Sequence, residues 1–324
     1  MTSTPPDAPT LRELSVNGIR LRVAEQGQGP LLLFCHGWPE SWYSWRAQMA
    51  AAAAAGWRAV APDMRGYGGS EAPAEVDRYT LLHLVGDVVG LVQALGETSA
   101  VIVGHDWGAP VAWHAALLRP DLFRAVAGLS VPYAPPIPLD LLGALERRGI
   151  TSFYMQYFQA EGVAEAEFER DVADALRRIT VSGSGDAPEG LAFGLMEPGR
   201  GFLHHSVAPA TLPAWLSEAD LAHYVAEFQR AGFRGGLNWY RNLRRNAQLL
   251  APWYGRPVTQ PSLFIAGERD AVLKFPASRA QIAAFGQTLP GLRGCHLLPG
   301  AGHWVQRERA DAVNALLLDF LRGL

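Results

Sequence analysis

The stretch Ala100-Val-Ile-Val-Gly-His-Asp-Trp-Gly108 decides how this chain folds. Its first four residues form a short, continuous apolar run, as expected for a strand that is buried on both faces of a parallel sheet. A helical pattern follows from Trp107 to Leu118. The glycines on either side of the centre let the backbone turn sharply between strand and helix, and such a turn pushes the central side chain, Asp106, into a pocket.

Similar apolar runs recur along the chain and alternate with helical segments. Two segments in which apolar and polar residues alternate lie on either side of Asn17-Gly18. They predict a hairpin, because Asn-Gly favours a type I′ turn. The repeated order strand, helix, strand then indicates an α/β fold, with a mostly parallel central sheet and helices on both faces. Besides the elements named above, we predict strands at Leu31–Cys35, Ala59–Ala61, Val126–Leu129, Ser262–Ala266 and Cys295–Leu298, and helices at Ser44–Ala55, Leu81–Leu95 and Arg309–Leu321.

A segment without strand patterns interrupts this order. The linker 131–138 is stiff because it is rich in proline, and the pattern from Leu139 to about Leu250 is helical and rich in aromatic residues. Since strand-like runs return after it, we interpret the segment as an inserted helical lid. The chain is therefore divided into a first part of the core (residues 1–135), a helical cap (136–250) and a second part of the core (251–324).

Charge and cysteine content restrict the function classes. The 324 residues include 28 basic and 31 acidic side chains, a net charge of −3, which argues against nucleic acid or anionic lipid as a partner. Lys274 is the only lysine, so a Schiff-base enzyme would have a single candidate amine. Cys35 and Cys295 lie in apolar runs without metal-ligand spacing, and we expect both to be buried free thiols.

Hydropathy indicates the cellular location of the protein. The leader Met1–Thr10 lacks the basic start and the apolar run of a signal peptide. No apolar stretch approaches the roughly 18 residues that a membrane span needs. We expect a cytoplasmic protein without a membrane span, and the sequence leaves open whether it is a monomer or a homodimer.

The aspartate at the centre of the turn suggests covalent chemistry. A carboxylate with an ordinary pKa of about 3.9 is ionised at pH 7 and needs no base before it attacks. It suits a saturated carbon that bears a leaving group, which would give an alkyl ester on Asp106, and it suits amides poorly. The alternative interpretation is a plain turn in which Asp106 caps the following helix.

Further groups are expected beside this nucleophile. Asp270 and His303 follow predicted strands, and the order nucleophile, acid, histidine is that of α/β-hydrolases. His303, with an ordinary pKa of about 6.5, would take a proton from water, and Asp270 would fix its tautomer, with Glu268 as the alternative acid. The backbone N–H groups of Trp38 and Trp107 would form an oxyanion hole.

The motifs resemble those of the epoxide hydrolases of the α/β-hydrolase fold, and they are His36-Gly-Trp-Pro39, Gly104-His-Asp-Trp-Gly108, Gly267-Glu-Arg-Asp270 and Gly302-His303. The lid segments 154–167 and 232–242 are similar to the hydrolase domain of mammalian soluble epoxide hydrolase, whose preceding phosphatase domain is expected to be absent here. The resemblance implies that two lid tyrosines donate hydrogen bonds to the epoxide oxygen. Motif matching carries this role to Tyr154 and Tyr240, with Tyr157 as the alternative to Tyr154. It also implies a small apolar epoxide and water as substrates, a vicinal diol as product and no cofactor.

Other interpretations stay open from the sequence. A haloalkane dehalogenase uses the same three catalytic groups, but it commonly has an asparagine where this chain has Trp38. A catalytically silent relative that binds a small apolar ligand would keep the same pocket. Glu40 either helps to hold the hydrolytic water or forms a salt bridge. His204-His205 is expected to lie in an exposed lid loop and to bind no metal, because no partner ligand occurs at metal spacing.

Overall fold

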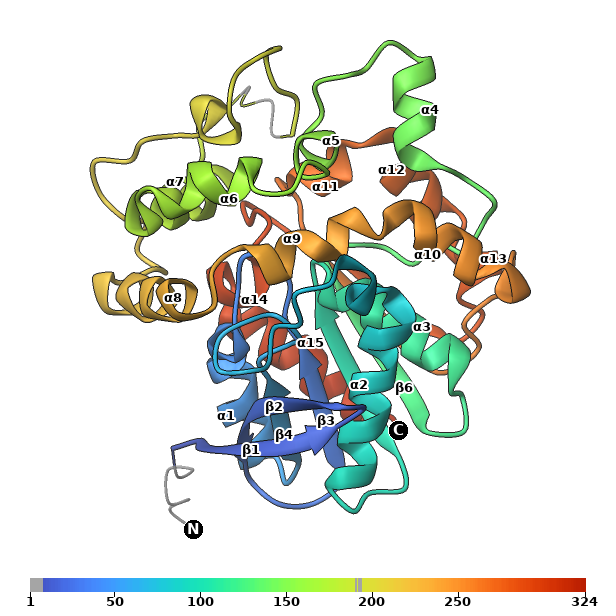
Figure 1. The fold of residues 1–324 in the computed structure, drawn as a ribbon. Coiled ribbons are helices and arrows are strands. Elements are labelled where there is room, and N and C mark those ends of the chain that lie inside the picture. The colour runs from blue at the N-terminus through green and yellow to red at the C-terminus, as the bar shows by residue number, and fades with distance from the viewer. Residues whose placement is uncertain (1–7, 190, 192–193) are drawn as a thin grey trace.

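The computed structural model describes residues 8–189, 191 and 194–324, so most of the leader lies outside the described residues (Figure 1). The described strands form one sheet in the order β1-β2-β4-β3-β5-β6-β7-β8. The pairs β1–β2 and β2–β4 are antiparallel and the other pairs are parallel, which confirms the expected α/β architecture. The strands are β1 Thr10–Val16, β2 Ile19–Gln26, β3 Leu31–Cys35, β4 Arg58–Pro62, β5 Ala100–His105, β6 Phe123–Leu129, β7 Ser262–Gly267 and β8 Leu292–Leu298.

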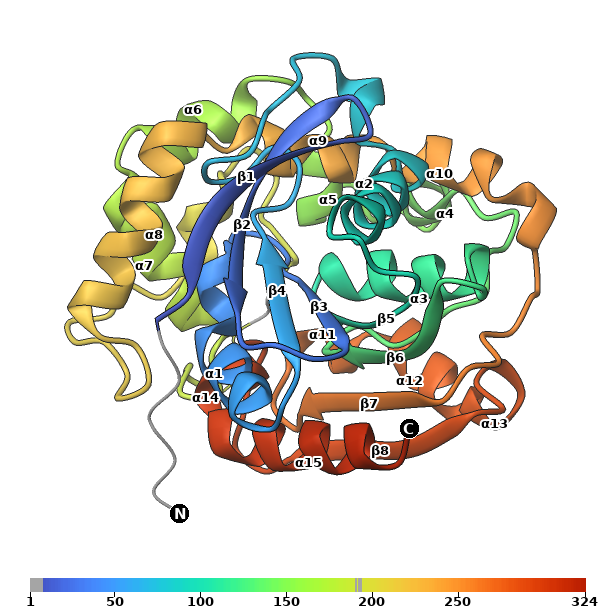
Figure 2. The ribbon, with the colours of Figure 1, turned by 90° about the horizontal axis from the view of Figure 1, so that it is seen from below.

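Helices cover both faces of this sheet (Figure 2). One face packs against α1 (Arg46–Ala54) and α15 (Ala310–Arg322), and the other packs against α2 (Leu81–Ala94) and α3 (Gly108–Leu118). The shorter helices of the core are η1 Trp42–Trp45, η2 Val76–Tyr79, α11 Ala271–Lys274, α12 Pro276–Ala283, α13 Phe285–Thr288 and α14 Val305–Glu308.

Strand β3 illustrates why the buried strands are apolar throughout. Leu31, Leu33 and Cys35 pack into the hydrophobic cluster that contains α2 and α3. Leu32 and Phe34 point the opposite way, into the cluster that contains α1 and α15. Since successive side chains of a strand alternate between faces, a strand between two layers of helices must be apolar at every position.

The local predictions at the hairpin and at the first helix are confirmed with one shift. Asn17 (φ 47°) and Gly18 (φ 75°) both have positive φ, as a type I′ turn requires. The helix predicted from Ser44 starts two residues later, because the 3₁₀ turn η1 precedes it. Gly56 follows its end at φ 83°, a backbone conformation that favours glycine.

The lid lies between β6 and β7 and above the carboxyl ends of the parallel strands (Figure 1). Apart from one isolated bridge, Phe153–Leu195, its described residues form helices, turns and loops. The cap boundaries at residues 136 and 250 stay a prediction. The lid helices are α4 Leu141–Arg147, α5 Tyr154–Tyr157, α6 Val163–Glu169, α7 Val172–Gly183, η3 Phe202–His205, α8 Glu218–Ala231, α9 Arg234–Arg241 and α10 Leu243–Leu249, and the 3₁₀ turn η4 Ala251–Trp253 follows the predicted boundary.

Hydrogen bonds join the lid to the core next to the site. The Asn242 side chain donates to the Val76 carbonyl oxygen at 2.6 Å, and the Trp239 indole donates to the Arg65 carbonyl oxygen at 3.2 Å. The His303 N–H donates to the carbonyl oxygen of Gly183, the last residue of α7, at 2.8 Å. The lid is therefore held in register with the loops that follow the strands.

The edge strand β8 corrects one expectation from the sequence. Its residues alternate between partly buried and exposed, because β8 has a neighbour on one side only. Cys295 is a free thiol as expected, but it is exposed and not buried. Cys35, on the central strand β3, is free and buried, and burial raises the pKa of its thiol.

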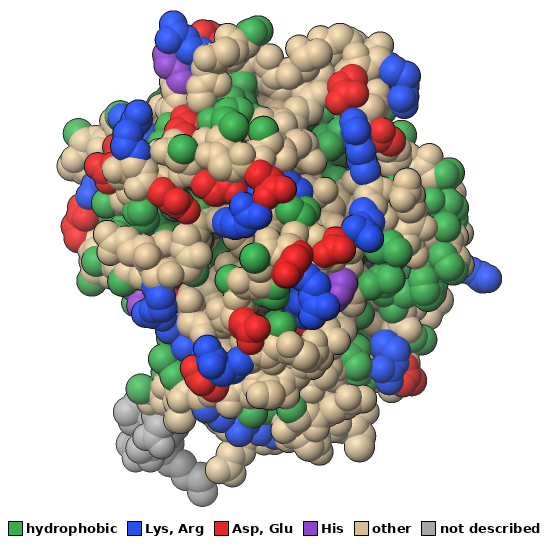
Figure 3. Space-filling model, viewed as in Figure 1, with side chains coloured by type: hydrophobic (Ala, Val, Ile, Leu, Met, Phe, Trp, Pro, Cys, Tyr) green, Lys and Arg blue, Asp and Glu red, His purple; other side chains and the backbone are tan. Residues whose placement is uncertain are grey.

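The surface carries charges of both signs. On the face drawn in Figure 3, the Lys and Arg side chains lie interspersed with Asp and Glu side chains and form no continuous basic field. This distribution accords with the small net charge. Among the described helices, none has the length and the apolar character required to cross a membrane.

Candidate active site

Asp106 stands in a strained turn between β5 and α3. Its φ of 48° is unusual for a residue with a side chain. The turn depends on its glycines: a Cβ on Gly104 would lie 2.0 Å from the Gly108 carbonyl oxygen, and a Cβ on Gly108 would lie 2.0 Å from that of Cys35. The turn can therefore form only with small residues on both sides of Asp106. It presents the carboxylate at the carboxyl end of the central strand β5.

Backbone N–H groups surround the Asp106 carboxylate. The Trp38 N–H, in the loop after β3, donates to Asp106 Oδ1 at 2.7 Å. Gly37 leaves the space for this contact, since a Cβ there would lie 2.3 Å from the same oxygen. Trp107 follows Asp106 at the start of α3, where backbone N–H groups are free of partners within the helix and favour negative charge.

The structure brings Asp270 and His303 to this carboxylate. His303 Nε2 lies 3.5 Å from Asp106 Oδ2, and His303 Nδ1 lies 3.2 Å from Asp270 Oδ1. Asp270 is fully buried and also accepts a hydrogen bond from the Val272 N–H at 2.9 Å. Glu268, the alternative acid, is exposed. The carboxyl ends of β5 and β7 and the loop after β8 thus meet as the chain order predicts.

Mutual charge sets the ionisation of the pair. Burial alone would lower the pKa of His303, but the charges of Asp270 and Asp106 and a hydrogen bond to each of these carboxylates outweigh it and raise this pKa well above its ordinary value. Burial would raise the pKa of Asp270, but the nearby His303 ring holds it below its ordinary value. The ring is therefore cationic when both carboxylates are ionised.

The two predicted lid tyrosines meet above Asp106. Tyr154 in α5 and Tyr240 in α9 are buried, and their ring centroids are 5.8 Å apart. Burial raises the pKa of both phenols and the charge of Asp106 raises them further, so both stay protonated donors at neutral pH. Tyr157, the alternative to Tyr154, donates instead to Glu167 Oε2 at 2.8 Å.

Aromatic rings of lid and core pack together beside Asp106. The ring centroid of Trp38 lies 5.2 Å from that of Phe158, 6.2 Å from that of Phe202 and 6.1 Å from that of Tyr240. The Trp107 ring meets the Tyr240 ring edge-on at 5.1 Å. Aromatic surroundings of this kind favour an apolar ligand with few polar atoms.

Glu40 belongs to a buried network, which excludes a surface salt bridge. Glu40 Oε2 lies 2.8 Å from His105 Nδ1, and the Gln306 amide donates to Glu40 Oε1 at 3.0 Å. Burial would raise the pKa of Glu40, but the His105 ring beside it lowers the pKa to about 2. His105 Nε2 in turn lies 2.7 Å from the His303 carbonyl oxygen, so the network supports the loop that carries the histidine.

Two side chains near the site were not expected there. The sequence marks His105 only as part of the turn before Asp106, and it carries no motif at Ser130. Ser130 directly follows β6, so the rule that placed Asp270 at a strand end could have found it. His36 holds the turn after β3, since its Nε2 accepts a hydrogen bond from the Met64 N–H at 2.9 Å.

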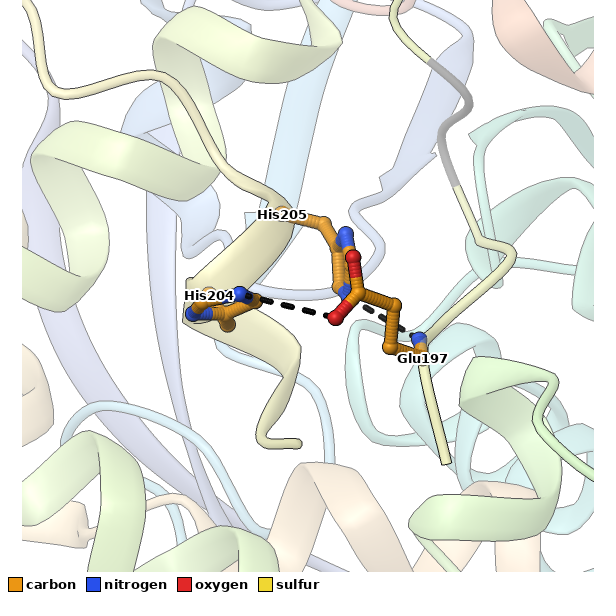
Figure 4. Close-up of side chains that lie close together, drawn as sticks. All are labelled: Glu197, His204 and His205. Atoms are coloured by element: carbon orange, nitrogen blue, oxygen red, sulfur yellow. Dashed lines mark hydrogen bonds and ion pairs between the residues drawn. The ribbon is translucent and has the colours of Figure 1, made fainter. Parts of the chain in front are cut away.

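The lid also holds a group of metal-ligating side chains outside this site (Figure 4). His204 is exposed as expected, but His205 is only partly exposed, and both belong to the 3₁₀ helix η3 and not to a loop. The expectation that no partner ligand is near is also wrong, because one donor atom from each of Glu197, His204 and His205 lies within 4.8 Å of the others. His204 Nε2 is 3.8 Å from Glu197 Oε2, and His205 Nε2 accepts a hydrogen bond from the Glu197 N–H at 2.9 Å. Two imidazoles and a carboxylate suit a zinc-like cation, and none of the three belongs to the Asp106 site.

The comparisons with known proteins agree with this geometry. Residues 30–187 match the model of the alpha/beta hydrolase fold family, so fold and site define an α/β hydrolase. Epoxide hydrolase A of Mycobacterium tuberculosis is 46% identical over 98% of each chain. The structure of an epoxide hydrolase from an endophytic Streptomyces is similar with a TM-score of 0.94 and 48% identity, and the match covers 98% of this chain and 96% of that one.

A mammalian relative extends the same result. Bifunctional epoxide hydrolase 2 of Mus musculus is 37% identical over 94% of this chain, which spans 54% of that protein. The chain belongs to the epoxide hydrolase family, which confirms the resemblance seen in its motifs.

Proposed function

We propose that this chain hydrolyses a small apolar epoxide to a vicinal diol in two steps, with Asp106 as the nucleophile. The observation that carries the proposal is the placement of the Asp106 carboxylate in a strained turn, with His303 Nε2 3.5 Å from its Oδ2 and with two buried lid phenols close enough for its charge to raise their pKa values. The similarity to epoxide hydrolases over nearly the whole chain supports the same reaction.

In the first step, an Asp106 oxygen attacks a ring carbon of the epoxide. The carbon–oxygen bond of the ring breaks on the side opposite the attack, and its electron pair stays on the ring oxygen. Tyr154 or Tyr240 gives this oxygen a proton, so the products are an alkyl ester on Asp106 and a neutral hydroxyl group. Because both phenols come from the lid and Asp106 comes from the core, donor and nucleophile lie on opposite sides of the substrate.

Formation of the ester switches the role of His303. The ester is neutral, so one of the two charges that raise the pKa of His303 disappears and this pKa falls. The proton that then leaves the ring replaces the one that the phenol gave to the epoxide oxygen, so the phenolate becomes a phenol again and His303 becomes neutral. His303 Nε2 becomes free to accept a proton from water, while Asp270 still holds the Nδ1 side of the ring.

In the second step, this water attacks the ester carbonyl carbon of Asp106. The negative charge that develops on the carbonyl oxygen is stabilised by the backbone N–H groups of Trp38 and Trp107. The Trp38 N–H already donates to Asp106 Oδ1 in the free enzyme. When the intermediate collapses, the leaving alkoxide takes a proton from His303 and departs as the diol. The Asp106 carboxylic acid that remains then gives its proton to His303, which restores the carboxylate and the cationic ring.

A single turnover in heavy-oxygen water tests the two-step route. We expect the label in the Asp106 carboxylate and unlabelled oxygen in the diol, as read by peptide mass spectrometry. Label in the diol with none in Asp106 would overturn the proposal. Asp106→Ala should abolish turnover, His303→Gln should accumulate the alkyl-enzyme, and Glu268→Gln, which changes an exposed acid, serves as the control.

The same experiments separate the other interpretations. Chloride release from chloroalkanes without diol formation from styrene oxide would indicate a dehalogenase, and tight binding of an epoxide without either product would indicate a silent binding protein.

The free cysteines Cys35 and Cys295 support a reducing compartment, so we also propose a cytoplasmic location, which cell fractionation tests. Light scattering decides between a 35.1 kDa monomer and a homodimer of twice that mass.

A further inference from the structure

Ser130 occupies an unusual backbone position at the edge of the site. It directly follows β6, is fully buried, and has φ 68°. Among the described residues with a side chain, only Asn17 and Asp106 share such a positive φ. Asn17 is in a hairpin turn, where this conformation is ordinary, but nothing in a serine favours it. The surroundings must therefore hold Ser130 in place, and such positions cluster at functional sites.

The contacts of Ser130 lie at the junction of two groups of the proposed mechanism. Its Oγ is 3.0 Å from His303 Nδ1, which is itself 3.2 Å from Asp270 Oδ1. A hydrogen bond from the Ser130 side chain also lowers the pKa of Asp270. The Ser130 N–H donates to the Ile265 carbonyl oxygen in β7 at 2.9 Å, which fixes the residue between the two strands.

The directions of these hydrogen bonds follow from what each group can do. An ionised carboxylate only accepts, so the single hydroxyl proton of Ser130 points to Asp270. A lone pair of Oγ is then left for the ring, and it can be satisfied only when Nδ1 carries a proton. The other nitrogen of the neutral ring, Nε2, must then carry the lone pair, and it faces Asp106 at 3.5 Å.

Asp270 has few other partners to hold it. Its Oδ2 is buried and has no hydrogen-bond partner among the described residues, so its satisfied contacts converge on Oδ1. Loss of the Ser130 hydroxyl would remove one of the donors of a fully buried carboxylate and leave it free to turn. On the Nδ1 side, the ring then keeps only the longer contact with Asp270.

We propose that Ser130 is a positioning residue for ester hydrolysis, which fixes the base tautomer of His303 through its hydroxyl group. This inference rests on the proposed function. It places Ser130 in the second step only, because the attack of Asp106 on the epoxide needs no base.

Two substitutions separate the hydroxyl from the backbone. Ser130→Ala removes the hydroxyl and keeps a Cβ at positive φ, whereas Ser130→Gly removes the hydroxyl and also relieves the backbone strain. We expect both variants to form the alkyl-enzyme at the wild-type rate and to hydrolyse it about ten-fold more slowly, the effect of one hydrogen bond to a charged group. Rapid mixing followed by mass spectrometry of the adduct measures both steps.

Ser262→Ala is the matched control. Ser262 is a fully buried serine at the start of β7, and its Oγ has no hydrogen-bond partner among the described residues. Its loss should change neither step. Wild-type hydrolysis in Ser130→Ala, or an equal slowing of both steps in Ser130→Ala and Ser130→Gly, would overturn the inference. Failure of the wild type itself to form an adduct would instead refute the proposed function, so the two failures are distinguishable.

Discussion

Replacing Asp106 with asparagine should lower the pKa of His303, because the amide imitates the neutral ester of the first step. Asp106 Oδ2 and His303 Nε2 are 3.5 Å apart, and their side chains are 15% and 10% exposed. At an effective dielectric constant of about 20, two unit charges at this distance attract each other by about 5 kcal/mol. Solvent at the partly exposed groups weakens the interaction, and we expect about 2 kcal/mol, an effect that a titration resolves readily.

Proton NMR titration of ¹³Cε1-labelled histidine measures this effect directly. The His303 signal is assigned by its absence in His303→Gln, and its pKa in Asp106→Asn is compared with the wild-type value. Asp270 still holds the pKa of His303 up, so the fall is partial. Glu268→Gln, an exposed acid two residues from Asp270, should leave the titration unchanged. An unchanged or higher pKa of His303 in Asp106→Asn would refute the charge switch.

Thermal unfolding at several pH values measures the same interaction between Asp106 and His303 through the stability of the protein. Because the pKa of His303 is raised in the folded state, the protonated ring contributes stability that is fully present below the unfolded pKa of about 6.5. This contribution is lost as the pH rises through the folded pKa. Asp106→Asn removes part of it, so the variant should lose most stability relative to the wild type near pH 6 and less at higher pH.

The remaining predictions concern the donors, the turn and the lid cluster. Tyr154→Phe and Tyr240→Phe should each slow formation of the alkyl-enzyme about ten-fold in rapid-mixing experiments, while Tyr157→Phe, whose phenol is bonded elsewhere, should not; a similar effect in all three would refute the assignment. Gly104→Ala should lower the free energy of unfolding by about 3 kcal/mol or more, because its Cβ would lie 2.0 Å from a carbonyl oxygen, whereas Gly286→Ala meets no atom within 4 Å and should be tolerated in thermal unfolding. Dialysis against EDTA should leave turnover unchanged, because attack and hydrolysis use only protein groups; a loss restored by zinc would show that the lid cluster contributes to activity.

The chain sequence predicted that Asp106, Asp270 and His303 lie together because each follows a recognisable local pattern. A buried parallel strand must be apolar at every position, so Ala100–Val103 and Ser262–Ala266 are visible as strands, and polar residues directly after them stand at the sheet edge where ligands bind. The glycines around Asp106 mark a turn that no larger residue can make. The lid tyrosines needed more than periodicity, since a tyrosine in a helical segment reads equally well as packing, and only the resemblance singled them out.

What the sequence by itself determined is thus the order of strands and helices, the inserted lid and the groups that follow the strand ends, because burial and turn geometry act on neighbouring residues. Tertiary structure alone decided the contacts of groups that no motif marks. It brings Ser130 to His303 and Asp270, turns Glu40 toward His105, places Glu197 beside two histidines and leaves Cys295 exposed on an edge strand. These contacts join residues that no regular spacing in the sequence relates, and they exist only once the sheet and the lid have packed together.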